Sequence, residues 1–406
     1  MTDVDIVVPR TVLQAGLQRL SSAPRWPVRL AAHWNMTGKC RQLLLSSLPP
    51  GREGGSTFRL HAHLAAAQED DGPTGYLLID HEQNEMLARV RTEDGQKLLP
   101  RHLLLVGPGM KQLLLRGENE TITASERWSR FIGALDLDTL AAFANLRFVL
   151  VGAGRNGSLM ASSLMHAGVR HLTLMDPDIM ELHNLDAMDG VTEADIGHPK
   201  AEALAQGLRR ADGSGPRAVV CSVVTPRGIA TLRAADVIIS CVDDDGARLA
   251  TAMVAALYMK PLLDIGSGIM RTAGERQMGG DVRLVLPGEG RCLACFGGLA
   301  RMQDIEALLR NRTIERPWNA ERAGSLRSLN QINVHLGLRL LEDLFAGEVE
   351  RSTWLRLTWQ GNVPSIEEIV PPTRRDCPLC QCEGMGDESL ADMPRLARNV
   401  HAWLSG

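Results

Sequence analysis

The chain has 406 residues, enough for two or three domains with separate cores. Apolar residues make up 44% and charged residues 23%, a composition that excludes wholesale disorder. The net charge of −4 and the aromatic content of 4% exclude a global basic surface and extensive base stacking, so we expect neither a nucleic-acid nor a membrane partner. No apolar run approaches the ~20 residues of a membrane helix, and the acidic start does not resemble a signal peptide. We therefore expect a cytoplasmic protein.

The first 120 residues predict a small α+β domain that precedes a larger one. We expect a helix at residues 11–20 and strands at three short apolar runs that are separated by turns rich in glycine and aspartate. These runs lie at 43–45, 76–79 and 103–106. The polar, turn-rich segment 116–125 is expected to link this domain to the second, which spans residues 121–406.

Two histidines in the first domain, His61 and His63, form an H-x-H motif. The motif resembles the start of the JAB/MPN metalloprotease motif, in which a proline, a serine and an aspartate follow. Here Leu64 replaces the proline, and no S-x-x-D follows within ten residues. Zinc catalysis also needs a third ligand and a general base. The resemblance therefore implies a degenerate, non-catalytic relative, and a different binding module is the alternative.

Apolar strand-like runs alternate with helical stretches throughout the second domain. The runs lie at 148–151, 172–175, 218–224, 237–239 and 262–265, and helices are expected at 158–166, 200–210 and 324–344. This alternation is typical of a doubly wound, mostly parallel, Rossmann-like sheet. The predicted fold class is therefore α/β.

The strongest local motif is a glycine-rich loop between the first of these strands and its helix. Gly152, Gly154 and Gly157 form G-x-G-x-x-G, and Asp176 ends the next strand. The glycines permit a tight turn and close approach to a phosphate, which the free N–H groups of the helix N-terminus attract. The loop predicts an adenosine-nucleotide site with Asp176 on the ribose hydroxyls. A second G-x-G, at 107–109, lacks the third glycine and predicts an ordinary turn.

The residues that follow this loop differ from those of a nicotinamide-dependent enzyme. Asp178 and Asn184 come soon after the first acid, and Lys200 opens a helix. Asp243 ends an apolar strand five residues before Arg248. Carboxylates at strand ends beside a lysine and an arginine suit Mg-ATP, because the acids hold the metal and the cations balance phosphate charge. A solvated acidic loop would explain any one of these clusters, but not all of them in this order.

Four of the eight cysteines form two C-x-x-C pairs, Cys292 with Cys295 and Cys377 with Cys380. Each pair can place two thiolates on one ion, so together they predict a tetrahedral Zn²⁺ site that joins two distant segments. Four unrelated thiols are the alternative, because cytosolic cysteines also serve as buried fillers or nucleophiles.

From about Ser125 to the C-terminus, these motifs resemble the ThiF/MoeB/HesA family, whose fold is shared with ubiquitin-activating enzymes. The resemblance implies an ATP-dependent adenylyltransferase that activates the C-terminal glycine of a ubiquitin-like or sulfur-carrier protein. It implies ATP, Mg²⁺ and a structural Zn²⁺ as cofactors, and a conjugating enzyme as a further partner. It also implies a homodimer, because Arg130 corresponds to the family's arginine that reaches into the partner subunit's ATP site.

The resemblance also assigns roles to single residues. Arg155 and Asn156 lie inside the glycine loop and join its three glycines as nucleotide-binding candidates. The family's ribose-binding acid, paired acid, loop asparagine, phosphate lysine and magnesium-binding aspartate correspond to Asp176, Asp178, Asn184, Lys200 and Asp243. The candidate catalytic residues are Arg130, Lys200, Asp243 and Arg248, and the zinc positions are Cys292, Cys295, Cys377 and Cys380.

Three features depart from the family pattern. Ala187 replaces a phosphate-binding arginine, so Arg155 is a candidate substitute, with a solvent-facing side chain as the alternative. Phe131 replaces a glutamine of the opening motif. Residues 300–325 contain no cysteine where thioester-forming members carry one, so we expect adenylation followed by direct transfer. Cys382 is the remaining thioester candidate, and a bystander or an alternative zinc ligand is the competing interpretation.

Two other classes of function stay open at this point. The glycine loop also fits a Rossmann oxidoreductase that binds NAD(P), and a nucleotide-binding pseudoenzyme could present the first domain to a partner. The presence of Lys200 and Asp243 argues against the pseudoenzyme, because a scaffold needs neither residue.

Overall fold

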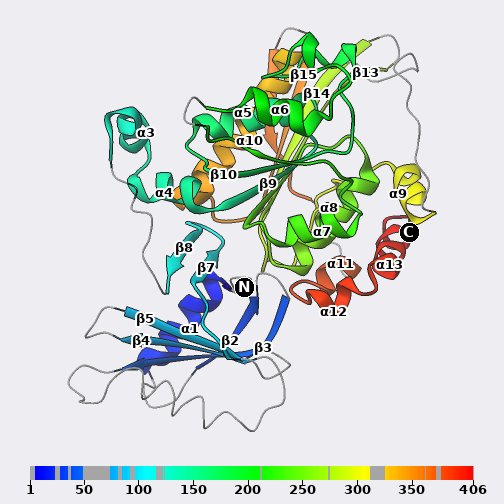
Figure 1. Cartoon of the computed structure of the whole chain (residues 1–406). Coiled ribbons are helices and arrows are strands. Elements are labelled where there is room, and N and C mark those ends of the chain that lie inside the picture. Colours follow the sequence, from blue (N-terminus) through cyan, green and yellow to red (C-terminus); the bar gives the residue numbers. More distant parts are fainter. Residues whose placement is uncertain are drawn as a thin grey trace.

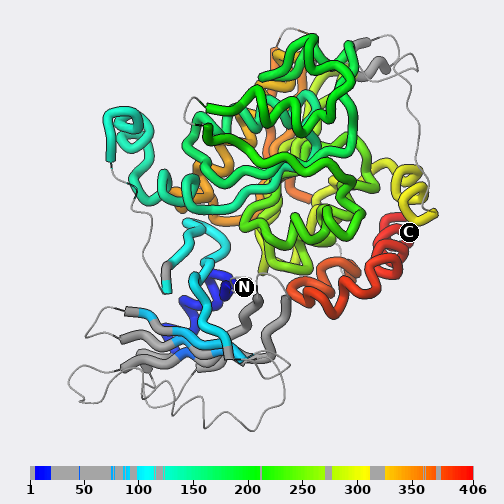
Figure 2. The backbone as a smooth tube through the Cα atoms, viewed as in Figure 1, coloured from blue at the N-terminus to red at the C-terminus, as the bar shows by residue number. Residues whose placement is uncertain are grey.

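The computed structural model describes residues 5–22, 28–34, 38–48, 74–80, 85–91, 97–115, 122, 124–210, 213–272, 275–310, 325–361, 363–371 and 376–405. These residues form two eight-stranded sheets that follow one another along the chain, as the ribbon in Figure 1 and the tube in Figure 2 show. The expected boundary between the domains falls in residues 116–121, outside the described part. His61 and His63 also lie outside the described residues.

The first sheet has the strand order β6-β5-β4-β3-β2-β1-β7-β8. The predicted helix and the three predicted strands of this part are confirmed in α1, β3, β4 and β7. Gly107 and Gly109, the glycines of the second G-x-G, lie in the turn between β7 and β8 with φ of +117° and +64°. The turn predicted at 107–109 is thus confirmed. The elements are β1 (Ile6–Pro9), α1 (Arg10–Ser22), β2 (Val28–Trp34), β3 (Gly38–Leu48), β4 (Thr74–Asp80), β5 (Glu85–Arg91), β6 (Lys97–Leu98), β7 (His102–Val106) and β8 (Lys111–Leu114).

The second sheet has the strand order β11-β10-β9-β12-β13-β14-β15-β16. Its first five strands are parallel, which confirms the predicted Rossmann-like α/β fold, and the last three extend it in antiparallel fashion. The strand predicted at 218–224 is shorter than expected and ends at Val219. The strands are β9 (Arg147–Val151), β10 (His171–Met175), β11 (Arg217–Val219), β12 (Val237–Ser240), β13 (Leu262–Thr272), β14 (Glu275–Val285), β15 (Thr353–Gln360) and β16 (Val363–Glu368).

Helices cover both faces of this second sheet (Figure 1). Alternate residues of β9 point to opposite faces, so that Phe148 and Leu150 join one core, whereas Val149 and Val151 join the other. The first core packs against α4 (Leu137–Asn145), α5 (Arg155–His166), α6 (Lys200–Gly207) and α10 (Arg327–Ala346). The second packs against α7 (Pro226–Arg233), α8 (Asp245–Leu257), α9 (Met302–Leu309), α11 (Pro378–Gln381) and α13 (Met393–Ser405).

The remaining helical segments are short. They are η1 (Glu126–Trp128), α3 (Ser129–Ala134), η2 (Leu182–Asn184), η3 (Glu193–Asp195) and α12 (Asp387–Leu390). In the part of the chain that the structure describes, no helix combines the length and apolar character needed to cross a membrane.

The two sheets meet at a cluster of charged side chains near the starts of their strands, in which the carboxylates are buried and Arg147 and His102 are half-buried. Arg147, which opens β9, forms ion pairs with Asp5 (2.9 Å) and Asp236 (2.7 Å), and the Nδ1 atom of His102 lies 3.1 Å from Asp5 Oδ1. Although burial raises the pKa of Asp5, the hydrogen bonds and charges of His102 and Arg147 bring it below its usual value. Arg147 thus links carboxylates that are contributed by both sheets.

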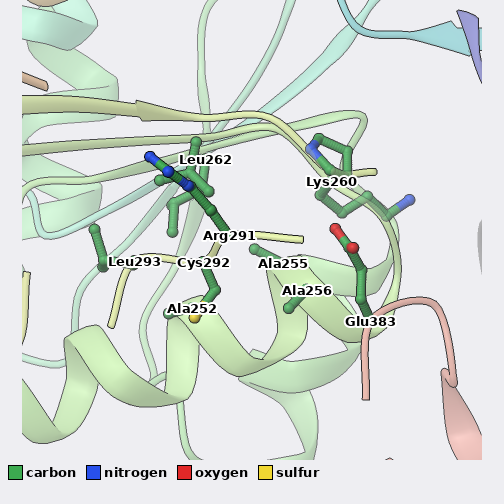
Figure 3. Close-up of a pocket in the computed structure, with 11 residues that line it drawn as sticks. Ala252, Ala255, Ala256, Lys260, Leu262, Arg291, Cys292, Leu293 and Glu383 are labelled. Atoms are coloured by element: carbon green, nitrogen blue, oxygen red, sulfur yellow. The ribbon is translucent and has the colours of Figure 1, made fainter. Parts of the chain in front are cut away.

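Lys260 precedes β13 and is buried, with 2% of its surface exposed. Its stem lines a small cavity beside Cys292 and Glu383 (Figure 3). The ammonium group has no hydrogen-bond partner among the described residues. Burial lowers the pKa of Lys260 to about 8, although the Asp236 carboxylate opposes this shift.

We predict that Lys260→Met stabilises the protein at pH 7. The unfolded chain keeps the lysine protonated up to about pH 10.5, whereas the folded protein releases this proton near pH 8, so the stability of the native sequence rises between these values. The variant lacks this rise. Its advantage at pH 7 is at most about 3 kcal/mol and shrinks towards pH 10.5. Urea unfolding across this pH range measures it.

The matched control is Lys111→Met, at an exposed lysine of β8. It should leave both the stability and its pH dependence unchanged. A Lys260→Met variant whose free energy of unfolding follows that of the native sequence at every pH would contradict the prediction.

Candidate functional site

The candidate site lies where the direction of chain winding in the second sheet reverses. From β9 the chain adds β10 and β11 on one side, and it then returns to add β12 on the other side of β9. In open α/β sheets, ligands bind outside the carboxyl ends of the strands at such a switch point. The glycine loop follows β9 and Asp243 follows β12, so the topology brings both to this point.

Close backbone packing explains two of the three loop glycines. Gly152 has φ of +90°, and a Cβ there would lie 2.9 Å from the carbonyl oxygen of Cys241. A Cβ on Gly157 would lie 1.8 Å from the Gly152 carbonyl oxygen. In contrast, apart from Gly154 itself and its chain neighbours, no heavy atom of the described residues lies within 4 Å of the Cβ position of Gly154, at the start of α5. The loop therefore leaves open space at the helix N-terminus, where phosphate groups bind in related loops.

Asp176, just after β10, holds the glycine loop through a hydrogen bond to its backbone. Its Oδ2 atom accepts a hydrogen bond from the Ala153 backbone N–H (2.6 Å), and Oδ1 accepts one from the Asp178 N–H (2.8 Å). Burial and the nearby Asp178 carboxylate raise the pKa of Asp176 above its usual value, although Lys200 opposes the shift. A carboxylate has about four lone-pair sites, so these two bonds use about half of the acceptor capacity of Asp176.

Lys200 lies beside these two aspartates. Lys200 Nζ lies 2.8 Å from Asp178 Oδ2, and the Asp178 side chain is 63% exposed. An ion pair to so exposed a carboxylate contributes little stability, and a phosphate contact of Lys200 stays a prediction. Asn184 is buried nearby, where its Oδ1 atom accepts a hydrogen bond from the Glu181 N–H and shapes η2.

The two polar loop residues point in different directions. Arg155 lies 3.1 Å from the carboxylate of Asp186, beside the buried Ala187, and its phosphate contact stays a prediction. Asn156 donates a hydrogen bond from Nδ2 to the Ser267 hydroxyl of β13 (3.1 Å). Ser267 in turn donates to Asn330 Oδ1 of α10 (2.7 Å). This polar relay ties the loop to elements over 100 residues further along the chain.

Three consecutive aspartates follow β12, and they differ in their surroundings. Asp243 is exposed, and Asp244 caps α8 by accepting a hydrogen bond from the Ala247 N–H (2.7 Å). Asp245 is 2% exposed and forms an ion pair with Arg248. Among the three, Asp243 is thus the exposed aspartate, and it comes shortly after β12, the strand beside β9.

Arg248 is directed towards the protein interior. Its guanidinium donates hydrogen bonds to Asp264 Oδ1 (2.9 Å), to Asp245 and to the Val242 carbonyl oxygen (2.7 Å). These hydrogen bonds join α8 to β13 and to the loop after β12. A contact of Arg248 with phosphate stays a prediction. Arg130 lies exposed on α3, which Figure 1 shows projecting from the body of the chain, away from the glycine loop.

The four predicted zinc ligands converge although 81 residues separate the pairs. The Sγ atoms lie within 4.8 Å of one another, with separations of 3.6 Å for Cys292–Cys377, 3.6 Å for Cys295–Cys380 and 3.9 Å for Cys292–Cys295. Four sulfurs at 2.3 Å from a tetrahedral Zn²⁺ stand about 3.8 Å apart. The donor set and its geometry are therefore compatible with zinc, and Cys382 is not one of the four.

The sequence did not point to several residues of this site. Four of them belong to no motif: Ser267 and Asn330 of the polar relay, Asp264 and Arg301. Arg301 donates a hydrogen bond to the Asp243 carbonyl oxygen. These four residues reach the site only through the packing of β13, α9 and α10. Ser267 lies between two glycines of β13, and the apolar residues before them predict only a strand.

Residues 128–329 match the ThiF family. The chain carries a ThiF-family domain. The predicted resemblance is confirmed, whereas the JAB/MPN-like character of the first domain stays a prediction. Among solved structures, the chain resembles MccB of E. coli in its complex with MccA-N7isoASN, at a TM-score of 0.50 and 16% identity, covering 63% of this chain and 75% of that one. This likeness concerns the fold alone.

Several curated proteins are similar in sequence. "Ubiquitin-like modifier-activating enzyme 5" of Drosophila grimshawi is 25% identical over 318 residues, 67% of this chain and 76% of its own length. "ATP-dependent ubiquitin transferase-like protein Cap2" of Enterobacter hormaechei is 35% identical over 25% of this chain and 17% of its own length. "Adenylyltransferase and sulfurtransferase MOCS3" of Danio rerio is 28% identical over 33% of this chain and 29% of its own length. The matches to the last two thus span less than a third of each relative.

We predict that the ThiF-family domain holds one Zn²⁺ on the four cysteines. Cys377→Ser should lower the zinc content and the melting temperature together, because the free energy of metal binding contributes to folding. Elemental analysis and thermal unfolding of the purified variant measure both. Cys382→Ser is the matched control and should change neither. A purified native protein without zinc, or an equal loss in the control, would contradict the assignment.

Proposed function

We propose that the chain is an ATP-dependent adenylyltransferase that activates the C-terminal glycine carboxylate of a ubiquitin-like or sulfur-carrier protein. The observation that carries the proposal is that the glycine loop and Asp243 follow two neighbouring parallel strands at the switch point of the sheet, with Lys200 paired to Asp178. In the reaction, a carboxylate oxygen of the carrier attacks the α-phosphorus of Mg-ATP. The bond from that phosphorus to the bridging oxygen breaks, and the products are an acyl-adenylate and pyrophosphate.

The residues of the loop suit the binding of the nucleotide. The N–H groups at the start of α5 border open space and can donate to phosphate oxygens, with help from the partial positive charge of the helix terminus. Asp176 has acceptor positions left for the ribose hydroxyls. Asn184 shapes the turn between these two parts of the site.

The charged residues suit the reaction itself. Lys200 can leave Asp178 to neutralise charge that develops on the phosphates, and Asp178 and Asp243 provide hard oxygen ligands for the Mg²⁺ of the substrate. Because this chemistry requires mainly positioning and charge neutralisation, no protein nucleophile is needed. Burial raises the pKa of the Cys241 thiol beside the site, which makes that cysteine a poor nucleophile.

The relatives support this reaction class. One is named as an activating enzyme for a ubiquitin-like modifier, and another as an adenylyltransferase and sulfurtransferase. We extend these activities to the present chain as part of the proposal, with a conjugating enzyme as a further partner and direct transfer from the adenylate. Cys382 remains the alternative site for a thioester.

We further propose a homodimer. Arg130 stands exposed on the projecting α3, away from the glycine loop of its own chain (Figure 1). An isologous pairing is the commonest way in which two copies of a chain complete each other's sites. Analytical ultracentrifugation tests this, and a fully active monomer would contradict it.

A nicotinamide-dependent oxidoreductase is the main alternative. It would share the glycine loop and Asp176, but it has no use for the lysine and the exposed aspartate around the phosphates. A nucleotide-binding scaffold would bind ATP without releasing pyrophosphate from it.

We predict that the protein binds Mg-ATP and does not bind NAD⁺, which isothermal titration calorimetry measures directly. With its carrier protein, it should exchange pyrophosphate into ATP, and Asp243→Asn should lower this exchange by at least about 100-fold, because the charge on the metal is lost. The melting temperature should stay unchanged, since Asp243 is exposed. Binding of NAD⁺ alone would support the oxidoreductase, and normal exchange by Asp243→Asn would remove Asp243 from the site.

A further inference from the structure

The loop that carries Asp243 is held at its backbone by residues from two other segments. On one side of Asp243, Arg248 donates a hydrogen bond to the Val242 carbonyl oxygen (2.7 Å). On the other side, the Asp245 N–H donates to Asp304 Oδ2 of α9 (3.1 Å). At Asp243 itself, the Nη1 atom of Arg301 donates to the carbonyl oxygen (2.8 Å). Three positions of the loop, 242, 243 and 245, are thus held at their backbone by other residues, and Asp244 between them caps α8.

Arg301 is itself held firmly in place. Its backbone N–H and that of Ala300 donate to Asp245 Oδ2, at 2.6 Å and 2.8 Å. The starts of α8 and α9 also touch closely, since a Cβ on Gly246 would lie 2.9 Å from the Asp304 carbonyl oxygen. The side chain of Arg301 therefore reaches Asp243 from a backbone that is anchored to the same loop.

We propose that Arg301 is a positioning residue for Asp243 in nucleotide-dependent catalysis. The inference rests on the proposed function, in which Asp243 holds the metal of Mg-ATP. Mg²⁺ demands near-ideal octahedral geometry, so a ligand carboxylate must be placed to within a few tenths of an ångström. The hydrogen bond from Arg301 fixes the backbone of the residue that carries this carboxylate.

The charge of Arg301 adds to this effect. Asp243, Asp244 and Asp245 are consecutive carboxylates whose mutual repulsion favours spreading of the loop. Arg248 offsets the charge of the buried Asp245, and Arg301 places a second guanidinium beside Asp243. A positive group here opposes the repulsion between these carboxylates.

Of the two arginines, Arg301 is the one that can be changed without damage to the fold. Arg248 pairs with Asp264, which is fully buried, and its loss would leave a buried carboxylate with weaker compensation. Arg301 is exposed, and it makes its side-chain hydrogen bond to a backbone carbonyl. Its substitution therefore affects the loop and leaves the core intact.

Calorimetric titration with ATP, with Mg²⁺ and separately with EDTA, distinguishes positioning of Asp243 from direct contact with phosphate. In Arg301→Gln, the affinity for metal-free ATP should stay within twofold of the native value, because the phosphate-binding loop is intact. The affinity for Mg-ATP should fall about tenfold, the loss expected for one charge-assisted hydrogen bond. Arg301→Lys should recover most of this loss, since its ammonium also donates to the carbonyl.

Two further variants sharpen the test. Arg301→Gln combined with Asp243→Asn should bind Mg-ATP no more weakly than Asp243→Asn alone, because both act on the same contact. Arg310→Gln, at an exposed arginine just after α9 that pairs with Glu306, is the matched control and should bind like the native protein. All variants should keep the native melting temperature.

An Arg301→Gln variant that binds Mg-ATP like the native protein would overturn the inference alone. Equal losses with and without Mg²⁺ would also overturn it, because they indicate direct contact with phosphate. A native protein that binds no Mg-ATP at all would overturn the proposed function and this inference with it.

Discussion

The close approach of the glycine loop to the end of β12 is the constraint on which the site depends. Gly152 has to turn the chain against the carbonyl oxygen of Cys241, and Gly157 has to let α5 pass over the Gly152 carbonyl oxygen. No side chain fits at either position. Because the backbones touch, the N-terminus of α5 and the loop of Asp243 follow two strands that lie side by side at this edge of the sheet.

A chain of buried ion pairs connects the start of α8 to the antiparallel part of the sheet. Asp245 pairs with Arg248, Arg248 with Asp264, and Asp264 with Arg283 of β14, which also pairs with Asp281. Breaking a buried pair typically costs about 3–5 kcal/mol, since the remaining charge is left without compensation. The antiparallel strands are thus coupled to the candidate site, although none of them carries a predicted site residue. The segment after the first cysteine pair continues this coupling through Arg301.

The sequence predicted the parallel half of the second sheet well, because its strands are buried on both faces and appear as short apolar runs. The glycine loop, its helix and the convergence of the cysteine pairs were predictable for similar local reasons. The antiparallel strands β14 and β15 were missed, because charged residues such as Asp281, Arg283 and Arg356 interrupt their apolar pattern. Asp281 pairs with Arg356 of β15, and Arg283 pairs with Asp264 of β13. The sequence of a single strand does not reveal partners on a neighbouring strand.

The side-chain roles were harder to predict than the positions. Arg248 follows Asp243 by five residues, a position from which we expected it to contact phosphate. In the structure, its guanidinium pairs with the buried Asp264 of β13 and is directed towards the interior. Arg301 stands outside every motif, and its relation to Asp243 arises only from the packing of α9 against α8. Local patterns therefore located the loop ends, whereas long-range ion pairs decide which charged groups face the ligand.

A crystal structure of the chain with Mg²⁺ and a non-hydrolysable ATP analogue tests the central claim most directly. We expect the phosphates to lie at the start of α5 against the N–H groups of residues 153–156, with the Asp243 carboxylate on the metal. An analogue bound away from the glycine loop, or a metal held without Asp243, would contradict it.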